Sequence, residues 1–241
     1  MRLFPFIFPL LLLASCGSKN VPAPDDPEAF SIRLLTAVRN GSDMAPYQDT
    51  LKKSDLDVLE NGLRSDEEKK SFWINLYNAF VQIELDQRNG CYSSKDAFFN
   101  AKNISIASEN ISLNDIENSI LRRKDALFND KLSPSKLDNR IHFALNCGAA
   151  SCPPISCYHS SGIEDQLEQS EDLFIRGTSK YDPINNTLEI SEIFNWYKDD
   201  FGGQSGILQL MSEKGIIPLY SNPTIQFKPY DWTITEPIFL E

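Results

Sequence analysis

Basic residues are scarce in this chain of 241 residues, which carries 23 Lys and Arg against 34 Asp and Glu and a formal net charge of −11. Their one short run is Arg122-Arg123-Lys124, a pattern typical of a solvated helix end. Proteins that bind nucleic acid neutralise its phosphates with clusters of Lys and Arg. Nucleic acid is therefore not an expected partner, and the acidic balance also disfavours binding to anionic lipid head groups.

Several catalytic motifs are missing as well. Neither a glycine-rich phosphate loop nor a Gly-x-Ser-x-Gly serine elbow occurs. No apolar stretch reaches the roughly twenty residues that a membrane-spanning helix needs, and there is no internal repeat. These absences leave nucleotide chemistry without support, and we expect no cofactor.

The chain begins with the pattern of an export signal. Met1-Arg2 precedes an apolar run of about eleven residues, too short to span a membrane, and a small-residue cleavage site follows. Leu13-Ala14-Ser15-Cys16 resembles the lipobox of bacterial lipoproteins, in which the cysteine thiol takes a diacylglycerol and the peptide before it is removed. We expect residues 1–15 to be a signal peptide and Cys16 to be lipidated with acyl chains such as palmitate. An ordinary secretory signal is the alternative.

Lipidation would place the protein in the cell envelope. Acylated Cys16 would hold it at the lipid bilayer, and Gly17 after the cysteine resembles the pattern of lipoproteins sent to the outer membrane in a host with two membranes. There it would face the periplasm or the cell surface. Residues 16–27 are polar and rich in proline, which favours an extended tether. Residues 28–241 are expected to form a single globular domain whose partner is an unknown envelope ligand or protein.

Helical periodicity dominates the rest of the chain, so we predict an α+β fold, mostly helical with a small β-sheet. A capping box of Ser65 and Glu68 opens a long helix from Asp66 to about Arg88, and Ser112 with Asp115 opens another. Other helices are expected over 28–40, within 51–63, over 163–174 and over 193–201. Strands are expected over 140–145, 187–190 and 225–234, the last with a break at Pro229.

A line of polar side chains follows the long helix. Its members, at steps of four, three and four residues, are Ser71, Asn75, Asn78 and Gln82. Two interpretations remain open: the amides hydrogen-bond neighbouring backbone and hold the packing, or they form the wall of a pocket. Glu117 lies on the polar side of the helix that begins after Ser112.

Four cysteines remain besides Cys16, namely Cys91, Cys147, Cys152 and Cys157. In an oxidising compartment they permit two disulfides, and the expected one lies within the last three or joins one of them to Cys91. None forms the tight pair with two intervening residues that structural zinc favours, so no metal site is predicted.

Residues 142–159 hold both histidines and three of these cysteines, an inventory that suits a thiol nucleophile. If the strand over 140–145 continues to Cys147, His142 and Asn146 share one face and Cys147 points to the other. Cys152 follows a turn at 148–150 and can fold back toward the His142 face, or lie at a helix start, where backbone amides lower the pKa of a thiol. Cys152 is therefore the first candidate nucleophile, Cys147 the second, and His142 the candidate base.

Five segments are similar to a bacterial and plant family known as domain of unknown function 547. They are Phe72-Trp73-Ile74-Asn75-Leu76-Tyr77-Asn78-Ala79, Ser112-Leu113-Asn114-Asp115-Ile116-Glu117, residues 140–153, residues 193–201 and Tyr230-Asp231-Trp232. The resemblance covers roughly residues 51–235. It implies one domain with a shared site, whose matching positions here are Asn75, Asn78, His142, Cys147 and Cys152. Cys91, Cys157 and His159 lie outside the pattern.

Two functions remain as hypotheses. The favoured one is a non-catalytic lipoprotein that binds an envelope ligand or protein, with Asn75, Asn78, Glu117 and Asn146 as candidate binding residues. The alternative is a thiol-type hydrolase or acyl transferase, with Asn75 or Asn78 orienting the base or stabilising an oxyanion.

Overall fold

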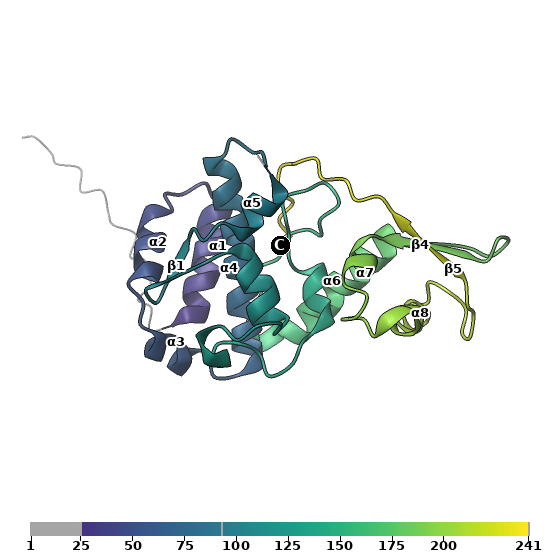
Figure 1. Cartoon of the computed structure of the whole chain (residues 1–241), viewed down its shortest axis with the longest axis horizontal. Helices are drawn as coiled ribbons and strands as arrows, with labels where there is room; N and C mark the ends of the chain where they lie inside the picture. Colours follow the sequence, from purple (N-terminus) through teal and green to yellow (C-terminus); the bar gives the residue numbers. More distant parts are fainter. Residues whose placement is uncertain (1–25, 93, 241) are drawn as a thin grey trace, which may run out of the picture.

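The computed structural model describes residues 26–92 and 94–240 (Figure 1). The predicted signal peptide, the lipidation site Cys16 and the tether up to residue 25 lie outside these residues. Asp26 accepts a hydrogen bond from the Ala29 amide and caps a helix that begins at Pro27. Within the described residues, no helix combines the length and apolar character needed to cross a membrane.

The first half of the chain folds around α4 (Asp66–Gln87), the long central helix (Figure 1). The predicted capping box opens it, because Ser65 and Glu68 each accept the other's backbone amide. Trp73 and Phe72 are fully buried in the core that α4 shares with its neighbours. These neighbours are α1 (Pro27–Arg39), α2 (Ala45–Lys52), α3 (Leu56–Gly62), α5 (Lys95–Asn100) and a hairpin of β1 (Ile104–Ile106) and β2 (Glu109–Ile111).

The second half has its own apolar core. Its elements are α6 (Ile163–Thr178), β3 (Lys180–Asp182), β4 (Thr187–Ser191), α7 (Ile193–Trp196), α8 (Gly203–Glu213) and β5 (Thr224–Lys228). β4 is the middle strand, antiparallel to β3 and parallel to β5. The connection from β4 to β5 runs through α7 and α8, as a parallel pair requires. Phe143, Phe194 and Met211 lie in this core and are fully buried.

After β5 the chain returns to the first half. Residues 229–240, which we call the C-terminal strap, run back toward α5 (Figure 1). The strap pairs with residues 149–155: the Ala150 amide donates to the Thr233 carbonyl at 2.8 Å, and the Ile155 amide donates to the Ile238 carbonyl at 2.8 Å. The strap therefore ties the two halves together.

The fold class is α+β and mostly helical, as predicted, with two small sheets rather than one. The helices over 28–40, 66–88 and 163–174 and the strand over 187–190 are confirmed. The last predicted strand ends at Lys228 because Pro229 cannot donate to the ladder. The helix over 193–201 is shorter than predicted, since α7 ends at Trp196 and turns follow it.

The strand predicted over 140–145 was wrong. Residues 139–143 form η3 (Asn139–Phe143), a 3-10 helix that Asp138 caps by accepting the Arg140 amide. Ile141, His142 and Phe143 are all buried, but Ile141 packs in the first core and Phe143 in the second. A short buried run has the same sequence pattern in a helix and in a strand, and here the run bridges two cores. The prediction that His142 and Asn146 share one face of a strand and that Cys147 points to the other is therefore wrong.

Candidate ligand-binding pocket

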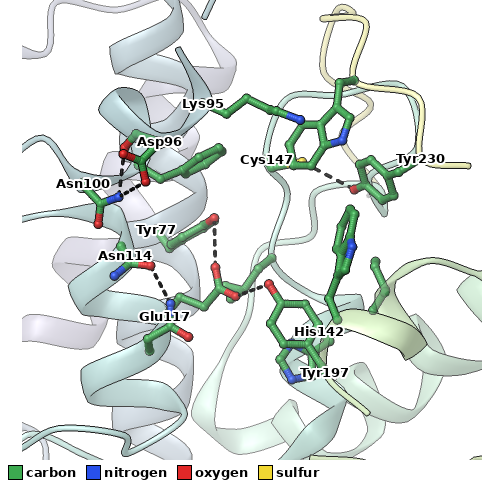
Figure 2. A pocket seen from close by; sticks show the side chains of 16 residues that line it. Tyr77, Lys95, Asp96, Asn100, Asn114, Glu117, His142, Cys147, Tyr197 and Tyr230 are labelled. Atoms are coloured by element: carbon green, nitrogen blue, oxygen red, sulfur yellow. Dashed lines mark hydrogen bonds between the residues drawn. The ribbon is translucent and has the colours of Figure 1, made fainter.

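A cavity of about 450 Å³ opens between the two halves of the molecule. One wall comes from α4, α5 and the segment 114–118, and the other from α7 and the C-terminal strap (Figure 2). Its volume lies in the range of about 300–1,000 Å³ that small-molecule sites occupy. Because neither half encloses it alone, the cavity depends on how the halves pack.

Glu117 projects into this cavity from η1 (Asp115–Leu121), a π-helix (Figure 2). The helix is fixed by the predicted cap, in which Ser112 and Asp115 exchange hydrogen bonds of 2.8 to 3.0 Å. Two tyrosine hydroxyls donate to the Glu117 carboxylate: Tyr197 at 2.6 Å and Tyr77 at 3.4 Å. Glu117 thus joins the two walls of the cavity.

Burial, together with the nearby Glu117 carboxylate, raises the pKa of Tyr77 and that of Tyr197 well above the ordinary value. Both hydroxyls therefore keep their protons at neutral pH. A neutral tyrosine hydroxyl has a single O–H group and donates one hydrogen bond. In both tyrosines Glu117 accepts that bond. The result is a carboxylate that accepts hydrogen bonds from two neutral hydroxyls.

His142 lies behind Tyr197. The two rings are stacked with centroids 3.8 Å apart, and His142 Nε2 lies 2.9 Å from Asp200 Oδ2. Burial lowers the pKa of His142, although the bond to Asp200 opposes that shift. Arg122 Nε also binds Asp200, at 2.6 Å. A neutral His142 held in this way positions Tyr197, which in turn holds Glu117.

Three aromatic rings form the outer wall. Trp196 from α7 contacts Tyr230 and Trp232 from the strap, with centroids 4.9 and 5.7 Å away, and the two strap rings lie 4.9 Å apart. Trp196 is 43% exposed although it is large and apolar. Lys95 from α5 places its ammonium 3.8 Å from the centre of the Trp232 ring.

Cys147 and Cys152 form a disulfide, which agrees with the predicted pairing within the last three cysteines. Cys147 lines the cavity, and its sulfur lies 3.4 Å from the Tyr230 hydroxyl (Figure 2). The Tyr92 hydroxyl donates to the Cys147 carbonyl. In the described part of the chain, Cys91 and Cys157 are free thiols.

Residues 61–175 match the family model described as "Protein of unknown function, DUF547". The resemblance noted from the sequence is therefore confirmed over these residues. No curated protein and no solved structure matches the chain. The DUF547 region supplies Tyr77, Glu117, His142 and Cys147 to the cavity, whereas α7 and the strap lie beyond it.

The three asparagines that the sequence suggested as site residues lie in the DUF547 region but do not line the cavity. Their side chains form hydrogen bonds with backbone groups. Asn75 donates to the Tyr158 carbonyl at 2.8 Å and accepts its amide at 2.9 Å. Asn78 joins the Ala144 carbonyl to the Asn146 amide in the same way. The Asn146 side chain in turn bonds the Pro153 carbonyl and the Gly148 amide. These amides hold the packing, which is the first of the two interpretations raised from the sequence.

The cavity thus brings together three of the predicted site residues, Glu117, His142 and Cys147. Cys152 does not line this cavity but lines two other pockets, of about 30 and 400 Å³. Among the described residues, no hydrogen bond joins His142 to either sulfur, because its bond is to Asp200. A free thiol paired with an imidazole base is therefore not part of this arrangement.

Sequence reasoning missed most of the cavity wall. The missed residues include Lys95, Asn114, Trp196, Tyr197, Tyr230 and Trp232. The aromatic ones stood in segments 193–201 and 230–232, which were noted for family resemblance but not joined to the site. Over the described ranges, no group of three or more His, Cys, Asp or Glu is placed to hold a metal ion.

Proposed function

We propose that this protein is a cell-envelope lipoprotein whose globular domain binds a small organic ligand without converting it. The observation that carries the proposal is the cavity of about 450 Å³, walled by aromatic rings and lined by the Glu117 carboxylate that Tyr197 holds in place. Large aromatic side chains left partly exposed around a cavity are typical of a ligand site. Cys147 and Cys152 are joined in a disulfide, whereas a thiol-type hydrolase needs a free thiolate as its nucleophile. The disulfide therefore favours ligand binding over catalysis by these cysteines.

Ligand retention tests the pocket. The protein and its variants are purified identically, and bound small molecules are extracted and identified by mass spectrometry. We expect one compound to be retained by the wild type and lost from the double variant Trp196→Ala, Tyr230→Ala, which removes two rings of the wall. Tyr220→Ala is the matched control, because Tyr220 is fully exposed and does not line the cavity. Equal retention by all three proteins would contradict the proposal.

Anchoring is tested separately, by growing bacteria that express the chain with an alkyne analogue of palmitate. The lipobox pattern predicts label on the wild type and a mature amino terminus at lipidated Cys16. We expect Cys16→Ser to lose the label and Cys91→Ser, which changes an exposed free cysteine, to keep it. Labelling of the Cys16→Ser protein would disprove the lipoprotein proposal and leave the ligand proposal standing.

A further inference from the structure

We propose that the ligand of this cavity is an organic cation, with its ammonium group held between the Glu117 carboxylate and the aromatic wall. This inference rests on the proposed ligand-binding function and names the ligand class.

The first support is an unbalanced charge. Among the described residues, no Lys, Arg or His forms an ion pair with Glu117, whose hydrogen bonds come from the two tyrosine hydroxyls. Each hydroxyl occupies one lone pair of a different oxygen, so both oxygens can accept another donor. A carboxylate that faces a cavity without a counter-ion favours a positively charged guest. The net charge of −11 also raises the local concentration of cations.

The second support is the aromatic wall. Ring faces attract cations through their quadrupole, and tryptophan does so best. Lys95 demonstrates this attraction within the molecule, because its ammonium already lies over Trp232. A ligand ammonium can bind to the ring faces in the same manner while the Glu117 carboxylate supplies its counter-charge.

Other ligand classes fit less well. A sugar would need several free amide and carboxylate groups around it, but besides Glu117 the polar side chains are engaged with one another: Asn118 donates to Asn114 at 2.6 Å and Asn100 donates to Asp96 at 3.0 Å. An anion would meet two carboxylates, Asp96 and Glu117, against the single ammonium of Lys95 among the residues that line the cavity. The remaining basic group in the lining, His142, is engaged by Asp200.

The experiment uses three small probes of similar shape: choline, its uncharged isostere 3,3-dimethylbutan-1-ol, and the anion 3,3-dimethylbutyrate. Binding to the full-length protein in detergent is followed by tryptophan fluorescence, since Trp196 and Trp232 line the cavity, and by calorimetry. We expect choline to bind at least about tenfold more tightly than either other probe, a difference that one charged contact supplies.

Two charge-removing variants sharpen the test. Glu117→Gln should weaken choline binding at least about tenfold, because it removes the counter-charge. Lys95→Gln should tighten choline binding, because it removes a cation that competes for the face of Trp232. The matched control is Glu109→Gln, an exposed acid on β2, which should bind like the wild type. Thermal melting of each variant checks that it folds.

The outcomes separate the two proposals. If the neutral or anionic probe binds as tightly as choline and Trp196→Ala abolishes that binding, the pocket function stands and the cation inference is overturned. Weaker binding by Lys95→Gln than by Glu117→Gln would also overturn it. If no probe binds at millimolar concentration, the inference fails, and the ligand-retention experiment then decides the pocket function independently.

Discussion

The buried amides of α4 illustrate what single side chains do in this fold. Asn75 and Asn78 are completely buried, and each satisfies a backbone amide and a backbone carbonyl of another segment. These segments are irregular and have no neighbouring strand to pair with, so the asparagine side chains supply the hydrogen bonds. A buried backbone group without a hydrogen-bond partner would raise the free energy of the folded state.

We therefore expect Asn75→Ala to lower the free energy of unfolding by about 3 kcal/mol, because it leaves the Tyr158 amide and carbonyl unpaired. Ligand binding by the folded fraction should persist, since Asn75 does not line the cavity. Urea denaturation measures the first effect and choline titration the second. The control is Asp86→Ala, an exposed position of the same helix. A loss of binding without a loss of stability would point to a direct role of Asn75 in the site.

Asp138 provides the clearest pH dependence. Although burial opposes it, hydrogen bonding to Arg140 and Lys70 lowers the pKa of Asp138 from 3.8 to about 2. A carboxyl group with a lowered pKa stabilises the fold above its unfolded pKa, and this contribution disappears as pH falls from about 4 to about 2. In urea denaturation we expect Asp138→Asn to be less stable than the wild type by about 2 kcal/mol at pH 7. The difference should shrink below pH 4, and a constant difference down to pH 2.5 would contradict the assignment.

At the scale of elements, the loop 147–152 sets one edge of the cavity. Gly148 has a φ of +88°, which other residues rarely adopt, and a Cβ there would lie 2.4 Å from Leu85 Cδ1, so any other residue would be strained in this turn. The disulfide closes the loop, and the sulfur of Cys152 also accepts the Cys147 amide at 3.0 Å. The loop is therefore held by both covalent and backbone constraints.

Removal of this disulfide should destabilise the protein. For a sequence separation of 5, loop-closure entropy predicts a loss of about 2 kcal/mol in the double variant Cys147→Ala, Cys152→Ala. Urea denaturation without reductant measures it, and Cys91→Ala serves as the control. Reductant should bring the wild type to the stability of the double variant; no effect of reductant would show that the bridge does not constrain the unfolded chain.

At the scale of the whole molecule, the cavity walls belong to two apolar cores. A ligand that contacts both walls stabilises both cores. When the free ligand concentration is one hundred times the dissociation constant, the free energy of unfolding rises by about 2.7 kcal/mol. We expect saturating choline to slow amide hydrogen exchange both in residues 114–121 and in the strap. The Glu117→Gln variant should show neither effect at the same concentration. Protection confined to one half would mean that the ligand does not bridge the walls.

The sequence alone determined most of the local elements, the fold class and three of the residues that line the cavity. Capping boxes and apolar periodicity act within a few residues, so α4 and the start of η1 could be placed correctly. The site residues Glu117, His142 and Cys147 also stood out by their chemistry. Hydrogen-bonding amides were recognised, but their partners were not, because Tyr158 lies 83 residues from Asn75.

Only the tertiary structure decided where the site lies. Trp196, Tyr230 and Trp232 face the DUF547 region because the strap folds back over the loop 149–155, and no local pattern encodes that return. The same packing made residues 139–143 a 3-10 helix between two cores instead of a strand. Short-range signals specify which residues form helices, whereas the cavity arises from long-range burial of two apolar cores against each other, a property of the whole chain.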